Sequence, residues 1–224
     1  MKIIAKIHND FKEKFGIPRQ SGLSGELKSK IVFEPEYRNP DALRGIDGYS
    51  HLWLIWQFSE AIRDDWSPTV RPPRLGGNKR VGVFATRSPY RPNPIGLSSV
   101  KLEAIENTKD EGTVLIVSGA DLLDGTPIYD VKPYIAYSDC HTDAISGFAD
   151  PVREYKLNVV FCKELLSKVD ISKQNSLISI LEQDPRPSYQ NDPDREYGMR
   201  FASYEIFFKV DGDTLTVTRV EIKK

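Results

Sequence analysis

The chain has 224 residues, of which 39% are hydrophobic and 28% are charged. These values are typical of one or two soluble globular domains and exclude global disorder. The formal net charge of −1 excludes a bulk polycation that is held to nucleic acid by its overall charge.

Cysteine content and hydropathy narrow the class further. Two cysteines, Cys140 and Cys162, exclude a disulfide framework and a four-cysteine zinc site, and we expect no bound metal. The N-terminal sequence reaches Asp10 too soon for a signal peptide. The longest apolar run, Leu52–Trp56, is far shorter than the roughly 20 residues that span a bilayer. We therefore expect a cytoplasmic protein without a membrane segment.

Residues 1–152 are expected to form a mainly β domain. Many short strands separated by Gly/Pro turns are typical of a barrel or a sandwich, and the helices of a doubly wound sheet are absent. The segment 52–58 is apolar almost throughout, which predicts a strand buried on both faces. The expected strands are Ile3–Ile7, Ile31–Phe33, Leu52–Phe58, Val81–Ala85, Ser98–Ile105, Thr113–Val117 and Ile128–Ile135.

Residues 153–224 change in character and predict a small α+β domain. A helix is expected over Ser172–Glu182, with Ser172 as its N-cap, because apolar residues cluster after a capping residue. A shorter helical segment is expected before it. The other expected elements are the strands Leu157–Phe161, Arg200–Val210 and Leu215–Ile222, and the short helical segment Cys162–Val169.

A basic block interrupts the otherwise acidic chain. No acidic residue occurs between Asp65 and Glu103, so this block places a positive field at one site. Prolines and glycines stiffen and turn the same stretch, and arginines on a stiff loop lose less entropy when they bind phosphates. We favour an anion or nucleic-acid surface over a solvated basic loop. The block contains Arg71, Arg74, Lys79, Arg80, Arg87, Arg91 and Lys101.

Three further segments combine turn residues with polar side chains. The segment 85–97 has three prolines within six residues, which indicates the wall of a ligand site more than a plain surface loop. The segment 121–128, Asp-Leu-Leu-Asp-Gly-Thr-Pro-Ile, is either a simple turn or a holder of a polar small molecule. The Pro/Arg/Gln loop at 16–23 is weak by itself. No G-x-G-x-x-G fingerprint or P-loop is present.

Taken together in this order, these segments resemble one family. They look like TrmO, the YaeB/TsaA-like family of S-adenosylmethionine-dependent tRNA methyltransferases, and the resemblance covers essentially the whole chain. The segments are Pro-Arg-Gln (18–20), Leu-Arg-Gly-Ile-Asp-Gly-Tyr-Ser-His-Leu-Trp (43–53), Arg-Pro-Pro-Arg-Leu-Gly-Gly-Asn (71–78), Gly-Val-Phe-Ala-Thr-Arg-Ser (82–88), Arg-Pro-Asn-Pro-Ile-Gly (91–96) and Asp-Leu-Leu-Asp-Gly-Thr-Pro (121–127).

The resemblance implies a small single-sheet β-barrel that binds the cofactor at 1–152, and a homodimer with the cofactor near the subunit interface. It implies N6-methylation of threonylcarbamoyl-adenosine at position 37, next to the anticodon of a threonine tRNA. The cofactor contacts that it implies are Pro18, Arg19, Gln20, Ser59, Glu60, Arg87, Leu97, Asp124, Gly125, Thr126 and Pro127.

The reaction expected from this resemblance is an in-line displacement, in which an adenine amine attacks the methyl group of a sulfonium. Positioning and exclusion of water do most of the work, and Asp124 or Tyr90 are candidates to take or relay the amine proton. Arg71, Arg74, Lys79, Arg80 and Arg91 are expected to contact tRNA. The alternatives are a non-catalytic RNA- or anion-binding barrel and a methyltransferase for another RNA amine.

Overall fold

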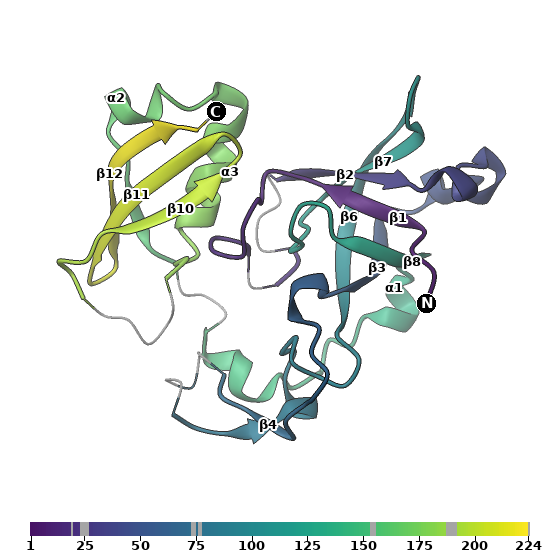
Figure 1. Cartoon of the computed structure of the whole chain (residues 1–224), viewed down its shortest axis with the longest axis horizontal. Helices are drawn as coiled ribbons and strands as arrows, with labels where there is room; N and C mark the ends of the chain where they lie inside the picture. Colours follow the sequence, from purple (N-terminus) through teal and green to yellow (C-terminus); the bar gives the residue numbers. More distant parts are fainter. Residues whose placement is uncertain are drawn as a thin grey trace.

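The structure is a computed structural model that describes residues 1–18, 20–22, 27–72, 75, 78–152, 156–186 and 192–223. Strands dominate both parts of the chain, so the predicted mainly β class is confirmed. The N-terminal part and the C-terminal part each form a sheet of their own (Figure 1). Each sheet has its own apolar core. Among the described residues, no helix is both long enough and apolar enough to cross a membrane.

Six strands of the N-terminal part form a closed barrel in the order β1-β2-β7-β6-β3-β8. All neighbouring strands in this ring run antiparallel. Apolar side chains fill the interior, and Leu52, Leu54 and Ile128 are fully buried there. The strands are β1 (Ala5–His8), β2 (Lys28–Phe33), β3 (His51–Gln57), β6 (Ile95–Thr108), β7 (Gly112–Ser118) and β8 (Pro127–Pro133).

The long connection from β3 to β6 carries a small two-stranded hairpin of its own. Its strands are β4 (Thr69–Val70) and β5 (Val81–Gly82), and they pair antiparallel. The helix α1 (Ala136–Asp139) follows the barrel. Short 3₁₀ turns occupy Pro35–Tyr37, Pro40–Leu43, Ile46–Gly48, Ser59–Ala61, Val83–Ala85 and Gly147–Val152.

The C-terminal part is a four-stranded sheet with helices, in the strand order β10-β11-β12-β9. Buried residues of β11 alternate with exposed or half-buried ones, and Ile206 and Phe208 are fully buried. The elements are β9 (Asn158–Val160), α2 (Lys163–Leu166), α3 (Ile171–Leu181), β10 (Tyr197–Phe201), β11 (Tyr204–Asp211) and β12 (Thr214–Ile222).

The structure corrects two expectations in the barrel domain. The strand expected over Val81–Ala85 has only the two residues of β5, and Val83–Ala85 is a 3₁₀ turn. The segment around β3 is not buried on both faces, because Trp53 and Ile55 alternate with buried neighbours and remain half-buried. A closed barrel has one interior face, so apolar residues on the outer face of β3 pack only partly.

Two further expectations in the C-terminal domain are corrected. The cap of α3 is Asp170, whose carboxylate accepts a hydrogen bond from the Ser172 backbone N–H at 2.9 Å. The run Arg200–Val210 is not one strand, because the chain turns at Ala202 with a φ of 53° between β10 and β11. The alternation of apolar residues continues through this tight turn and therefore hides it in the sequence.

Candidate active site

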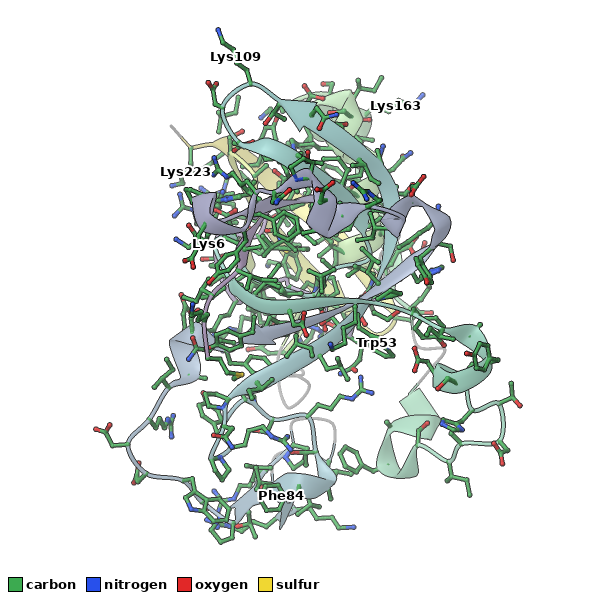
Figure 2. All side chains as sticks on the ribbon, turned by 90° about the vertical axis from the view of Figure 1, so that its right-hand side faces the viewer. Lys6, Trp53, Phe84, Lys109, Lys163 and Lys223 are labelled. Atoms are coloured by element: carbon green, nitrogen blue, oxygen red, sulfur yellow. The ribbon has the colours of Figure 1, made fainter. Side chains whose placement is uncertain are left out.

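The candidate site lies at one end of the barrel. Because neighbouring strands are antiparallel, the connections β1–β2, β3–β6 and β7–β8 all leave from the same end. These connections span residues 9–27, 58–94 and 119–126, and Leu97 and Pro127 lie near the start of the strands that follow. Figure 2 shows Phe84 of the β3–β6 connection at one extreme of the molecule and Lys109 of the β6–β7 turn at the opposite extreme. Every described cofactor residue predicted from the sequence therefore belongs to one end; Arg19 lies outside the described residues.

A hydrogen bond joins two of the predicted cofactor segments directly. The Arg87 guanidinium donates from Nη1 to Oε1 of Gln20, across 67 positions of sequence. Arg87 is exposed and Gln20 is half-buried, so the pair lies at the surface of the barrel end. The β1–β2 connection is also held by the Gly22 N–H, which donates to the Gly119 carbonyl at 2.8 Å. The first and third connections are thus fixed side by side.

Asp121 places a carboxylate beside this pair, and sequence reasoning did not select it as a site residue. Its Oδ1 accepts a hydrogen bond of 2.5 Å from Ser98, whose Oγ accepts one of 2.9 Å from the Trp56 indole N–H. Burial raises the pKa of Asp121 above its ordinary value, against the opposing effects of the Ser98 hydrogen bond and the Arg87 charge. The sequence placed Asp121 at the start of the 121–128 turn segment, but it gave no sign that this carboxylate is buried against Ser98.

Asp124, the other carboxylate of this connection, is held very differently. It accepts hydrogen bonds from Lys12 Nζ at 2.6 Å and from the Asn9 backbone N–H at 2.9 Å. Burial opposes its ionisation, but these hydrogen bonds and the Lys12 charge outweigh it, so the pKa of Asp124 is lowered. The following Gly125 has a φ of 77° and donates its N–H to the Ile7 carbonyl at 2.8 Å. Asp124 therefore ties the β1–β2 connection to the Asp-Gly-Thr-Pro turn.

The remaining predicted cofactor residues lie close to the same connections. Ser59 and Glu60 form an exposed 3₁₀ turn after β3, and Glu60 receives the Lys14 ammonium at 3.2 Å on both its carboxylate and its carbonyl. Leu97 pairs with Ile55 at the end of β3 and is 55% exposed, which is high for a leucine in a strand. Thr126 is buried in the turn.

The predicted tRNA residues are partly brought together. Arg71, Lys79 and Arg80 are exposed around the β4–β5 hairpin, and Arg80 donates to the Thr69 hydroxyl at 3.0 Å. Arg91 is half-buried and donates to the Thr86 carbonyl at 2.8 Å, so it also braces its own loop. Arg74 lies outside the described residues.

Exposed aromatic rings accompany these cations, and only Tyr90 among them was predicted from the sequence. Tyr90 is 43% exposed, and the Arg63 guanidinium covers its ring at 4.1 Å. Phe84 and Trp66 are 71% and 51% exposed, and their ring centroids lie 5.9 Å apart. Arg91 lies 5.9 Å from the Phe84 ring centroid. A surface of aromatic rings and guanidinium groups suits unpaired bases and phosphates.

The described residues contain no cluster of His, Cys, Asp and Glu that could hold a metal ion. The site instead offers the exposed guanidinium of Arg87, the carboxylate of Asp121 and the exposed apolar side chain of Leu97. These groups suit a small ligand that carries both charges and an apolar part. The fold and the site therefore define a mainly β, ligand-binding protein with an adjoining basic surface.

Comparison with known proteins identifies the family. The model of the tRNA-methyltransferase O N-terminal domain matches residues 6–140, and that of the TrmO C-terminal domain matches residues 154–223. The chain therefore belongs to the TrmO family, as its motifs predicted.

Individual relatives agree with this assignment. A tRNA (adenine(37)-N6)-methyltransferase from Escherichia coli (strain K12) is 42% identical over 193 residues, which cover 84% of this chain and 82% of the relative. The protein of the same name from Eikenella corrodens is 46% identical over 165 residues, which cover 73% and 92%. A crystal structure of TrmO from Pseudomonas aeruginosa superposes with a TM-score of 0.79 at 34% identity, covering 98% of this chain and 95% of that one.

Proposed function

We propose that this protein is a tRNA (adenine(37)-N6)-methyltransferase that takes its methyl group from S-adenosylmethionine. The relatives from E. coli and Eikenella corrodens carry that name, and other relatives are named for the cofactor. The substrate is threonylcarbamoyl-adenosine 37 of a threonine tRNA, as the family resemblance implies. The single observation that carries the proposal is the hydrogen bond from Arg87 to Gln20, because it unites two predicted cofactor segments beside Asp121.

The groups at the barrel end fit this cofactor. S-adenosylmethionine supplies an electrophilic methyl group on a cationic sulfonium, together with a zwitterionic amino-acid end and an apolar and polar nucleoside. Arg87 matches the carboxylate end by charge, and Asp121 matches a cationic group. Leu97 offers an exposed apolar surface, and the 124–127 turn belongs to the same end of the barrel. We assign the cofactor to the barrel domain at 1–152 and treat 153–224 as a separate α+β domain.

Transfer of a methyl group to an amine demands position more than strong acid or base. The residues must hold the attacking nitrogen in line and exclude water, and the proton leaves the amine during or after attack. Asp124 and Tyr90 are the two proton-relay candidates predicted from the sequence. The lowered pKa of Asp124 makes it a weak base, and its hydrogen bonds also hold two loops of the site together. The Arg63 guanidinium covers the Tyr90 ring, so Tyr90 also stabilises its own connection.

The tRNA surface that we propose comprises the basic residues and the exposed rings of the β3–β6 connection. Its predicted cations are Arg71, Arg74, Lys79, Arg80 and Arg91, and the Trp66–Phe84 pair adds a larger stacking surface than Tyr90 alone. The double variant Lys79→Ala/Arg80→Ala should weaken tRNA binding and flatten the plot of log affinity against log salt by about one to two phosphate contacts. Lys109→Ala, which removes one positive charge at the opposite end of the molecule, is the control for position (Figure 2). An unchanged slope in the double variant would remove these residues from the surface.

We further propose a cytoplasmic homodimer. Both cysteines are exposed and free, which suits a reducing compartment where tRNA is modified. The segment after β8 carries two nearly fully exposed apolar side chains, Tyr137 at 92% and Ile145 at 91%, which suit an interface between subunits. Sedimentation equilibrium tests this assembly, and a monomer at micromolar concentration would refute it.

The deciding experiment is calorimetric titration with S-adenosylmethionine and S-adenosylhomocysteine. We expect saturable binding by the wild type and at least tenfold weaker binding by Arg87→Ala. The control is Arg44→Ala, which also removes an exposed arginine but one that pairs with Asp41 at the other end of the barrel. Normal cofactor affinity in Arg87→Ala would refute the assigned site.

No binding with or without tRNA would favour the alternative of a non-catalytic RNA-binding barrel. A survey of unmodified RNAs tests the other alternative, methylation of a different RNA amine.

A further inference from the structure

The segment Asn9–Pro18, which we name the arm, joins β1 to the predicted cofactor residue Gln20 and runs between the two domains (Figure 1). The arm has no regular secondary structure, so contacts from outside must give it a fixed shape. Those contacts come from two different sources. One side of the arm faces the barrel end, and the other side faces the C-terminal sheet.

On the barrel side, the contacts are polar. Lys12 and Asn9 bind Asp124, as described above, and the Asp124 N–H donates in return to the Phe11 carbonyl at 2.8 Å. Lys14 reaches Glu60 of the turn after β3. These contacts fix the arm to the two loops that hold the other predicted cofactor residues. Exposed ion pairs of this kind contribute little by themselves.

On the C-terminal side, the contacts are apolar and extensive. Phe11 is 2% exposed and belongs to the core of the C-terminal domain, where its ring meets Phe201 edge-on at 6.4 Å. Phe15 and Ile17 pack against the same core. None of these three side chains belongs to the core of the barrel. The apolar anchoring of a barrel loop therefore comes from the other domain.

Polar contacts set the register of the arm on the C-terminal sheet. The Ala202 N–H donates to the Asp10 carbonyl at 2.9 Å, and the Arg200 N–H donates to Glu13 Oε1 at 2.7 Å. Lys173 of α3 forms an ion pair with the Asp10 carboxylate. Each contact joins one arm residue to one residue of the C-terminal domain.

Gly16 of the arm packs closely against Met199 of β10. Gly16 has a φ of 90°, which favours glycine, and a Cβ there would lie 3.0 Å from the Met199 sulfur. The arm therefore turns against β10 immediately before Pro18, where the predicted cofactor segment begins. The contact with β10 therefore lies two residues before that segment.

From these contacts we infer that the C-terminal domain is a positioning element of the cofactor site: it holds the arm so that Gln20 meets Arg87. This inference rests on the cofactor site proposed above. Binding of the cofactor selects the ordered arm, so apparent affinity falls in proportion to the fraction of molecules in which the arm is ordered. The C-terminal domain thus acts on S-adenosylmethionine affinity without touching the ligand.

The test uses the full chain with the contacts on the C-terminal side removed. The variants are Phe11→Ala, which empties the apolar anchor, and the milder double variant Glu13→Ala/Lys173→Ala. Glu13→Gln keeps an oxygen acceptor for the Arg200 N–H and is the conservative rescue. Lys168→Ala removes an exposed lysine of the same domain and is the matched control.

We expect faster hydrogen exchange in the arm of both disrupted proteins and about tenfold weaker S-adenosylmethionine binding, as for an arm that is ordered about a tenth of the time. KM for the cofactor should rise while kcat at saturating cofactor stays near wild type. Affinity for tRNA should stay within twofold. The single variant Glu13→Gln and the control Lys168→Ala should both bind S-adenosylmethionine normally.

Several results would overturn the inference. Cofactor affinity within twofold of wild type despite a loosened arm would show that the arm needs no holding, and an arm that stays protected would show that the C-terminal domain does not hold it. A fall in kcat without a change in KM would show general damage instead of positioning. If Phe11→Ala does not fold, the double variant alone decides. Gln20→Ala separates the two proposals: normal binding there refutes the cofactor site itself, whereas weak binding there with normal disrupted variants refutes only the inference.

Discussion

The contact between Gly96 and Trp56 allows a quantitative test of how the site is packed. A Cβ at Gly96 would lie 2.2 Å from Trp56 Cε2, so the indole has to move by more than 1 Å to restore van der Waals distance. Both residues are buried, and the backbone of Gly96 has no positive φ, so the cost of Gly96→Ala is steric. Overpacking of this kind costs about 1–3 kcal/mol. Displacing the indole also breaks its buried hydrogen bond to Ser98, which costs about 1 kcal/mol.

We therefore expect Gly96→Ala to lower the free energy of unfolding by about 2–4 kcal/mol. Urea denaturation followed by circular dichroism measures this change, with the slope m required to stay constant. The control is Gly82→Ala, where a Cβ meets nothing within 4 Å, and it should change stability by less than about 0.5 kcal/mol. Adding Trp56→Leu should relieve the clash, so the double variant should lose less stability than the sum of the two single variants. A Gly96→Ala protein as stable as the control would refute the steric argument.

Three further outcomes follow from charge and backbone geometry, each measured by urea denaturation. Because the folded-state pKa of Asp124 is lowered, its ionised carboxylate stabilises the fold above the ordinary Asp pKa, and this stabilisation is lost as pH falls through the lowered pKa. Asp124→Asn should remove this pH dependence, and its loss of unfolding free energy relative to the wild type should be largest near neutral pH. Because the pKa of Asp121 is raised, its ionisation lowers the stability of the fold as pH rises from the ordinary Asp pKa through the raised pKa. Over this pH range the free energy of unfolding of Asp121→Asn should therefore increase relative to that of the wild type. Ala202→Gly should stabilise the β10–β11 turn by up to about 1 kcal/mol, since glycine adopts its φ of 53° without strain, whereas Ser203→Gly should destabilise.

Much of the barrel can be predicted from local sequence signals, and the errors in this prediction have local causes. Strands β3, β6, β7 and β8 lie within a few residues of their predicted places, because apolar runs end at Gly/Pro turns. The expected strand Val81–Ala85 is mostly a turn, because its apolar residues line the β3–β6 connection instead of a sheet. The β-propensity of a residue describes how well it suits a strand, but a strand forms only where a neighbouring strand is available to pair with it.

The candidate site was predicted by motif and not by contact. Gln20 and Arg87 lie 67 positions apart, and no local pattern says that their side chains meet. Asp121 was part of a recognised turn motif, but its role depends on burial beside Ser98, which only the closed barrel creates. The participation of the C-terminal domain could not be predicted for the same reason. Phe11 is an isolated apolar residue in a loop, and Phe201, whose ring it contacts, lies 190 positions later.

The two carboxylates of the β7–β8 connection illustrate why positioning dominates this site. Asp124 is fully engaged by donors from the arm, which makes it a fixed anchor and a poor base. Asp121 faces Ser98 and Arg87, and burial makes it the more basic of the two. If the reaction needed only a base near the amine, either carboxylate would serve and the arm would be dispensable. If it needs an in-line geometry, loss of the anchor must affect cofactor binding even though Asp121 is intact. Comparing Asp124→Asn with Asp121→Asn in cofactor affinity and in single-turnover rate separates these two requirements: an anchor moves the affinity, whereas a base moves the rate and its pH dependence.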